Sequence, residues 1–149
     1  MIELNDWEPI PRKDVSLLFL TTVPRAIFSP IQLQKGIFLI SKNLPELFEI
    51  NYNFMPYDYG PYDADVYADI KQLEKEELAK IFFISSPSHN SYVATHLGFK
   101  YTQNYEISNR AKNYIKEVVE WILPLTMSRI IGAIVRQYPE YSANMIFRN

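Results

Sequence analysis

The chain has 149 residues, a length typical of a single domain, and its 48% hydrophobic and 21% charged residues are ordinary for a globular protein. A formal net charge of −2 excludes a strongly basic nucleic-acid binder, although a local basic patch remains compatible with it. The absence of cysteine excludes a disulfide framework and a thiolate zinc site. We see no long linker and no repeat, and we predict one domain over residues 1–149.

Two features of the sequence bear on location. Residues 1–6 are acidic and lack the basic-then-apolar order of a secretory signal. The apolar runs at residues 15–20 and 130–135 are too short to span a bilayer. We therefore expect a cytoplasmic protein.

Two helices are predicted in the first third of the chain. Asp14 is expected to cap a short apolar helix over residues 15–20, which ends before Pro24. Ser29 and Pro30 have the chemistry of an N-cap and a first helical position, so a second helix begins there and ends at Pro45. Its apolar face comprises Leu33, Ile37, Ile40 and Leu44.

A third helix is predicted to begin at Gly60-Pro61. Asp63 and Asp65 lie in its first turn, where the helix dipole favours negative charge. Its apolar stripe comprises Tyr62, Val66, Ile70 and Leu73.

The period of the pattern changes after the third helix. Residues 81–84 and 92–95 are rich in aromatic and β-branched side chains, and residues 85–90 have turn chemistry. This pattern predicts a β-hairpin, with residues 105–107 as a further short strand.

Two amphipathic helices are predicted at the end of the chain. Ser108 is expected to cap the first, and Pro124 separates it from a second helix over residues 127–138, which Pro139 ends. Their apolar stripes comprise Ala111, Tyr114, Ile115, Val118, Val119 and Ile122 in the first, and Met127, Ile130, Ile131, Ile134, Val135 and Tyr138 in the second.

The order of elements predicts a mainly α (α+β) fold. Three helices followed by a β-hairpin wing are the arrangement of a winged-helix-like domain, and the two last helices form a C-terminal extension from about residue 108. Helices of this kind either close the core of a monomer or join two chains, so a homodimer through the C-terminal helices is one prediction.

Three segments of the chain resemble a known family. Residues 33–40 are LQKGIFLI, residues 57–62 are YDYGPY with Tyr67 and LEKEEL (73–78) after them, and residues 134–141 are IVRQYPEY. In this order they are similar to the YwgA-like and SocA-like (Panacea) group of small bacterial and phage proteins. The resemblance implies a winged-helix-like domain that acts as an antitoxin against a toxin, or as a proteolytic adaptor. The chain differs at Glu77, where many winged helices carry glycine before the hairpin.

The third helix begins in an acidic segment. Asp58, Asp63, Asp65 and Asp69 occur there with no basic residue among them, and Asp65 and Asp69 share a helix face. Capping plus a solvated face is one interpretation, and an acidic docking surface or a divalent-cation site are the others. The spacing does not match the calcium loop of an EF-hand.

Tyrosines surround the same segment. Aromatic residues make up 15% of the chain, and 11 of them are tyrosine. Tyrosine is frequent at interface hot spots, so the cluster predicts either a partner-binding surface or the lower edge of the core. The cluster comprises Tyr52, Phe54, Tyr57, Tyr59, Tyr62 and Tyr67.

These features predict a non-enzymatic protein-interaction module, an antitoxin or adaptor, that binds a protein partner. The tyrosines would supply buried area, and the aspartates would attract a basic partner. Replacement of Asp65 and Asp69 by lysine is expected to abolish binding and leave the fold intact. The predicted contact surface comprises Tyr57, Asp58, Tyr59, Gly60, Pro61, Tyr62, Asp65, Tyr67 and Asp69.

A winged-helix DNA-binding transcriptional regulator is the alternative. The acidic third helix argues against DNA, because binding depends on neutralising phosphates, and a steep dependence on salt would be the sign of this function. Residues 76–149 nevertheless carry 8 basic and 6 acidic side chains, so a weakly basic face is expected there. Its residues would be Lys100 in the wing, and Arg110, Lys112 and Lys116 on the next helix, where a solvated helix face is the simpler interpretation.

No catalytic or cofactor motif is recognisable. The sequence has no nucleophile elbow, no HExxH and no glycine-rich phosphate loop, and only four glycines in all. His89 and His96 lie in or beside the predicted hairpin and are interpreted as surface histidines. We therefore expect no enzyme activity, no cofactor and no metal site.

Overall fold

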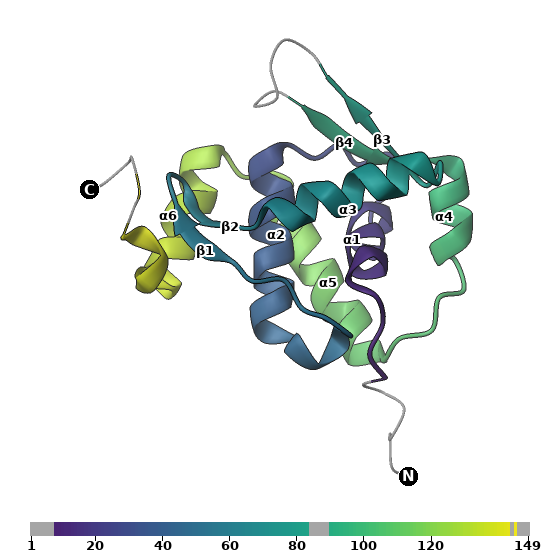
Figure 1. The fold of residues 1–149 in the computed structure, drawn as a ribbon, viewed down its shortest axis with the longest axis horizontal. Helices are drawn as coiled ribbons and strands as arrows, with labels where there is room; N and C mark the ends of the chain where they lie inside the picture. Colours follow the sequence, from purple (N-terminus) through teal and green to yellow (C-terminus); the bar gives the residue numbers. More distant parts are fainter. Residues whose placement is uncertain (1–7, 84–89, 144, 146–149) are drawn as a thin grey trace.

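The computed structural model describes residues 8–83, 90–143 and 145. Within these ranges the chain is mainly α, as predicted, with six α-helices and two separate two-stranded antiparallel sheets (Figure 1). None of the helices in these ranges is both long enough and apolar enough to cross a membrane. The α-helices are α1 (Arg12–Thr21), α2 (Pro30–Asn43), α3 (Ala64–Lys75), α4 (His96–Thr102), α5 (Asn109–Ile122) and α6 (Met127–Gln137). The strands are β1 (Met55–Tyr57), β2 (Gly60–Tyr62), β3 (Ala79–Phe82) and β4 (Ser91–Ala94), and the 3₁₀ helices are Pro45–Leu47 and Pro139–Ser142.

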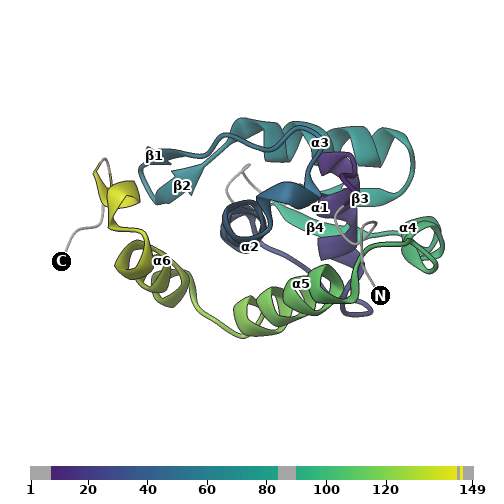
Figure 2. The ribbon, with the colours of Figure 1, turned by 90° about the horizontal axis from the view of Figure 1, so that it is seen from below.

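The helices form layers around α2. Figure 2 shows α2 nearly end-on, with α3 and the β1–β2 hairpin on one side of it and α5 and α6 on the other. Helix α1 packs against α3, α4 and α5. The core lies between these layers and includes the fully buried rings of Phe19, Phe28 and Phe38. The layers leave the two hairpins at the edge of the molecule, where both line one cavity.

Helix α1 forms as predicted, but Asp14 does not cap it. The helix begins at Arg12 after Pro11, which makes no side-chain cap bond. Asp14 lies inside the first turn, is 6% exposed, and accepts a hydrogen bond from Tyr105 Oη at 2.5 Å. The capping prediction was wrong because the tyrosine, 91 residues away in sequence, fixes the carboxylate on the core side of α1.

The predicted start of α2 is confirmed. Ser29 Oγ accepts from the backbone N–H of Gln32, and Gln32 Oε1 accepts from the backbone N–H of Ser29, which is a complete capping box. Pro30 stands at the first helical position, where its missing N–H is not needed. The helix ends before Leu44 and Pro45.

Helix α3 begins three residues later than predicted. Gly60 and Pro61 belong to strand β2, which pairs with β1 so that Pro61 lies opposite Pro56. Asp63 is the N-cap, and its carboxylate accepts from the backbone N–H of Asp65 at 2.9 Å. Gly60 and Pro61 therefore begin the second strand of a hairpin and do not begin a helix. The prediction was wrong because the pairing of residues 55–57 with 60–62 was not recognisable from the local sequence.

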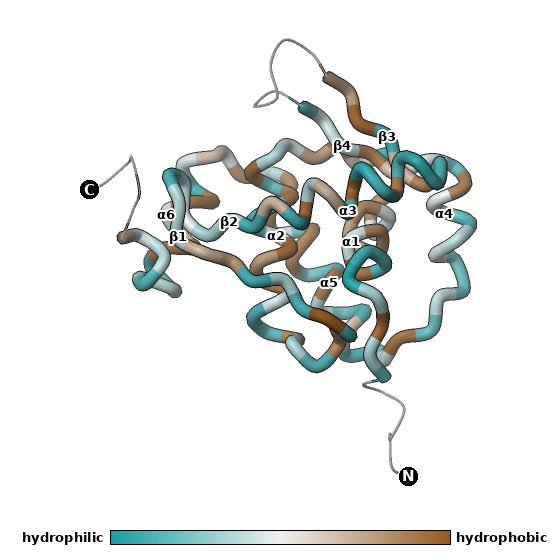
Figure 3. The backbone as a smooth tube through the Cα atoms, in the orientation of Figure 1, coloured by the Kyte–Doolittle hydropathy of each residue, from teal (hydrophilic) through white to brown (hydrophobic). Residues whose placement is uncertain are grey.

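The second hairpin, β3–β4, confirms the prediction of one strand before and one strand after a turn predicted at residues 85–90, of which 85–89 lie outside the described residues. Ala79 pairs with Ala94 and Phe82 with Ser91. Figure 3 shows apolar residues continuing to the outer end of β3, where Phe82 is 47% exposed. The outer end of β3 is therefore exposed in the described part of the structure.

The further strand predicted at residues 105–107 was wrong. These residues form the connection between α4 and α5 and belong to no strand. The short helix α4 before them was not predicted, although Thr95 caps it by accepting from the backbone N–H of Gly98 at 3.0 Å. A seven-residue helix carries too few turns to produce a visible period.

Helices α5 and α6 form as predicted. Ser108 and Thr126 cap them by accepting from the backbone N–H groups of Ala111 and Arg129. Helix α6 packs against α2 and β2, and its Ile130, Ile131 and Ile134 are almost fully buried within this chain. Most of the apolar stripe proposed for a homodimer is therefore already covered.

Glu77 adopts the left-handed backbone conformation, with φ 65°, at the end of α3. The N–H of Leu78 donates to the carbonyl of Leu73, and the N–H of Glu77 donates to that of Glu74, which closes the helix in a Schellman-type turn. Thr95 Oγ1 donates to the Glu77 carbonyl at 2.6 Å, so the N-cap of α4 also holds this conformation. A side chain in this region is strained, whereas glycine is not.

Replacement of Glu77 by glycine is therefore expected to stabilise the protein. Removing the Cβ relieves the left-handed strain, and part of this gain is lost to the greater freedom of glycine in the unfolded chain, which leaves about 0.5–1 kcal/mol. Urea unfolding followed by circular dichroism measures the change. Glu77→Ala is the matched control, because it removes the same charge and retains the Cβ; equal stabilisation by both variants would contradict the backbone explanation.

Candidate functional site

A cavity of about 660 Å³ opens between α2, α3 and the two hairpins. Five tyrosines contribute to its wall, and we call it the tyrosine pocket. They are Tyr57, Tyr59, Tyr62, Tyr67 and Tyr92. Ile31, Ile81 and Met127 add apolar surface, and Asp58, Lys35 and Lys71 are the charged residues of the lining.

The tyrosine rings contact one another in a row. Tyr57 and Tyr62 pack edge to face with centroids 5.2 Å apart, Tyr62 lies 5.9 Å from Tyr67, and Tyr67 stacks on Tyr92 at 5.8 Å. Such contacts fix ring positions beyond what burial alone achieves. Burial raises the pKa of Tyr67, so its hydroxyl remains protonated, and it donates to the carbonyl of Pro30 at 3.4 Å. The row forms a preorganised aromatic wall.

The predicted aromatic cluster divides into two groups. Tyr52 and Phe54 are 6% and 7% exposed and belong to the core, where Phe54 packs edge to face on Phe38. Tyr57 and Tyr59 are 52% and 37% exposed at the rim of the tyrosine pocket. The core interpretation is confirmed for Tyr52 and Phe54, whereas partner binding stays a prediction for the exposed Tyr57 and Tyr59.

Lys35 is a buried cation in the lining. It lies in the middle of α2, is 2% exposed, and its Nζ donates to the carbonyl of Pro61 at 3.0 Å. This bond ties α2 to strand β2. Because burial disfavours the charged form, the pKa of Lys35 falls to about 8.

Gln34 joins α2 to the start of α3. Its Nε2 donates to the carbonyl of Asp63 at 2.9 Å, and its Oε1 accepts from the N–H of Asp63 at 3.1 Å. The side-chain amide thus pairs with the backbone as a strand would. With 1% exposure, Gln34 holds the end of the β1–β2 hairpin against α2.

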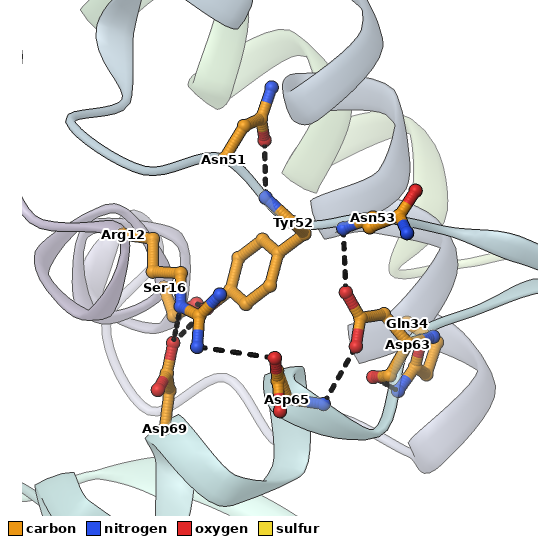
Figure 4. Close-up of polar contacts among 9 residues, drawn as sticks. All are labelled: Arg12, Ser16, Gln34, Asn51, Tyr52, Asn53, Asp63, Asp65 and Asp69. Atoms are coloured by element: carbon orange, nitrogen blue, oxygen red, sulfur yellow. Dashed lines mark hydrogen bonds and ion pairs between the residues drawn. The ribbon is translucent and has the colours of Figure 1, made fainter.

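Asp63, Asp65 and Asp69 of the acidic segment have structural partners, as Figure 4 shows. Asp69 accepts from Arg12 Nε at 2.9 Å and from Tyr52 Oη at 2.6 Å. Asp65 lies 3.3 Å from Arg12 Nη2, and the Asp63 carboxylate also accepts from the N–H of Asn53 at 2.7 Å. Arg12 therefore neutralises much of the charge that was expected to attract a basic partner.

The structure brings together part of the predicted contact surface. Tyr57, Asp58, Tyr59, Tyr62 and Tyr67 line the tyrosine pocket. Gly60 and Pro61 form the strand behind them, where Gly60 has φ 96° and Pro61 accepts the Lys35 bond. Asp65 and Asp69 lie outside the pocket lining, on the side of α3 that faces Arg12.

Three of the four predicted basic residues meet at a second cavity. Lys100, Lys112 and Lys116 line a space of about 550 Å³ bounded by α1, α4 and α5, together with His96. Lys100 lies in α4, so its assignment to the wing was wrong. Arg110 lies at the start of α5 and does not line this cavity. Lys116 is also 4.0 Å from Glu120.

Within residues 8–83, 90–143 and 145, no three histidine, aspartate or glutamate side chains are grouped as metal ligands. His89 lies outside these ranges, and His96 opens α4. Capping is confirmed for Asp63, whereas Asp65 and Asp69 pair with Arg12 instead of forming a purely solvated face.

The sequence did not single out Lys35, Tyr92 or Arg12 as residues of this region. Arg12 and Asp69 are 57 residues apart, and no local pattern joins them. The sequence did contain a sign that Lys35 is buried. Five apolar or small residues follow it and leave this part of α2 without a polar face. A scan against protein-family models gives no match to this chain, and a search among curated proteins gives none either.

Proposed function

We propose that this chain is a non-enzymatic protein-interaction module that binds a segment of a partner protein in the tyrosine pocket. The observation that carries the proposal is the row of contacting tyrosines around a cavity of about 660 Å³. That volume lies within the usual range of ligand sites, about 300–1,000 Å³. Tyrosine supplies large contact area at low entropic cost, which is why it is frequent among the residues that dominate binding energy.

The order α1, α2, α3 and then β3–β4 supports the proposal that this is a winged-helix-like domain. The three segments similar to Panacea proteins lie next to one another in space, since α2 packs against both β2 and α6 and the 3₁₀ helix Pro139–Ser142 packs against β1. Phe38 of the first segment contacts Tyr138 and Tyr141 of the third at 5.0 and 4.9 Å. An antitoxin or adaptor role follows from this resemblance as the more specific form of the proposal.

The pocket can be tested with selected peptides before any natural partner is known. A random peptide library displayed on phage is selected on the wild-type protein, and the enriched peptides are synthesised and titrated by calorimetry. The double variant Tyr57→Ser/Tyr62→Ser is expected to bind them about 100-fold more weakly, because both rim tyrosines lose their contact area.

Tyr101→Ser is the control for this test, since Tyr101 is 47% exposed on α4 and does not line the tyrosine pocket. Its affinity for the peptides should equal that of the wild type. Thermal unfolding of each variant shows whether the fold is retained. Full affinity in the double variant, or failure to enrich any peptide, would contradict the proposed function.

A DNA-binding regulator is the second candidate, and one observation favours it. Lys100, Lys112 and Lys116 converge on one cavity, which concentrates positive charge between α4 and α5. Binding to phosphates there would weaken steeply with added salt, because counterions are released on association. The salt dependence therefore distinguishes it from binding in the tyrosine pocket.

A further inference from the structure

The buried ammonium group of Lys35 has unused hydrogen-bonding capacity. A lysine Nζ carries three donors, and the hydrogen bond found for this one is that to the carbonyl of Pro61. The ion pairs among the described residues involve Arg12, Lys13 and Lys116, and none involves Lys35. A buried charge without a counterion is costly, so a carboxylate that reached it would be strongly favoured.

A second polar group of the same lining is incompletely bonded. Asn90 Nδ2 donates to Tyr92 Oη at 3.5 Å, and Asn90 Oδ1 is buried without a hydrogen-bond partner among the described residues. Unsatisfied buried polar atoms are rare in folded proteins and mark positions where a ligand or water completes the bonding. The lining thus offers an open hydrogen-bond acceptor beside Tyr92, which a peptide N–H can fill.

The charge balance of the pocket is positive. Lys35 and Lys71 face the cavity, and Asp58 is the carboxylate in its lining. The other titratable groups of the lining are the five tyrosines on the β1–β2 hairpin, α3 and β4. Asp65 and Asp69 form ion pairs with Arg12 and do not line the pocket. This balance is opposite to the one expected from the acidic sequence around the pocket.

We propose that the tyrosine pocket selects an acidic apolar peptide segment, whose apolar side chain packs against the tyrosines while its carboxylate bonds to Lys35. This inference rests on the proposed function for the peptide nature of the ligand. Lys35, which has no ion-pair partner among the described residues, and the aromatic wall together indicate the chemistry of that ligand.

Hydrocinnamate, an aromatic carboxylate, and hydrocinnamamide, its neutral amide, are suitable probes. Each is titrated into the protein at a pH of about 6.5, below the Lys35 pKa of about 8, while backbone amide NMR signals are followed. The acid is expected to shift the signals of the pocket residues and to bind about tenfold or more tightly than the amide. Lys35→Met should remove that preference, whereas Lys75→Met, an exposed lysine on α3 outside the pocket, should retain it.

The wild-type protein supplies a second test that does not depend on the folding of a variant. As the pH rises through about 8, Lys35 loses its charge, so affinity for hydrocinnamate should fall while affinity for hydrocinnamamide stays constant. Equal affinity for acid and amide at low pH, a preference retained in Lys35→Met, or no pocket shifts at millimolar acid would overturn the inference. Selected peptides that bind without acidic residues would overturn it and leave the proposed function intact, whereas acid binding without any peptide binder would do the reverse.

Discussion

Replacement of Asp69 by alanine is expected to lower the free energy of unfolding by about 2–3 kcal/mol. The carboxylate accepts from Arg12 and from the largely buried hydroxyl of Tyr52, and both donors would lose it. Burial and Asp69 together raise the pKa of Tyr52, so this hydroxyl remains protonated and would be left with its 3.0 Å bond to Ser16. Urea unfolding measures the loss.

Asp65→Ala is the matched control for that prediction. The Asp65 side chain is 56% exposed and lies 3.3 Å from the same arginine, so its removal should cost about 0.5 kcal/mol or less. Similar effects of the two variants would contradict the geometry. From this geometry, replacing Asp65 and Asp69 by lysine is expected to destabilise the fold as well, because a lysine at position 69 would place like charges beside Arg12.

Gly98→Ala is expected to destabilise the protein by about 3 kcal/mol. A Cβ at this position would lie 2.2 Å from the carbonyl oxygen of Leu78 and 3.4 Å from Leu17 Cδ1. The same carbonyl accepts the N–H of Thr95 at 3.1 Å, so it is fixed between α4 and the start of β3. The backbone must separate to admit a methyl group, which would loosen the packing of α4.

Gly132→Ala provides the comparison in the opposite direction. Its Cβ would meet only the end of the Arg136 side chain, at 3.4 Å, and alanine favours a helix interior over glycine by about 1 kcal/mol. Thermal unfolding should therefore show a lower midpoint for Gly98→Ala and a higher one for Gly132→Ala. A neutral effect of Gly98→Ala would mean that α4 lies farther from β3 than the structure places it.

The helices with clear caps and long apolar stripes could be predicted from the sequence. Ser29-Pro30, Ser108 and the proline at 139 each mark a boundary by local chemistry, and α2, α5 and α6 follow those boundaries. The start of α3 could not be predicted in the same way. It depends on the pairing of β1 with β2, and on the Gln34–Asp63 bonds, which join residues 29 positions apart.

The candidate site was predictable in its aromatic part only. The spacing of Tyr57, Tyr59, Tyr62 and Tyr67 pointed to a cluster, and four of the five tyrosines that line the pocket come from that segment. Its charge was not predictable, because the sequence shows an acidic stretch while the fold pairs those aspartates with Arg12 and places Lys35 in the lining. Net pocket charge depends on which side chains the tertiary structure neutralises.

The proposed function requires that the tyrosine pocket is the surface that binds a partner segment. Backbone amide NMR signals of the protein, mapped with and without a saturating selected peptide, locate that surface. We expect the largest shifts in residues 57–62, Gln34, Tyr67 and Tyr92, with little change elsewhere. Shifts centred on Lys100, Lys112 and Lys116 would contradict it and would place the working surface at the basic cavity between α4 and α5.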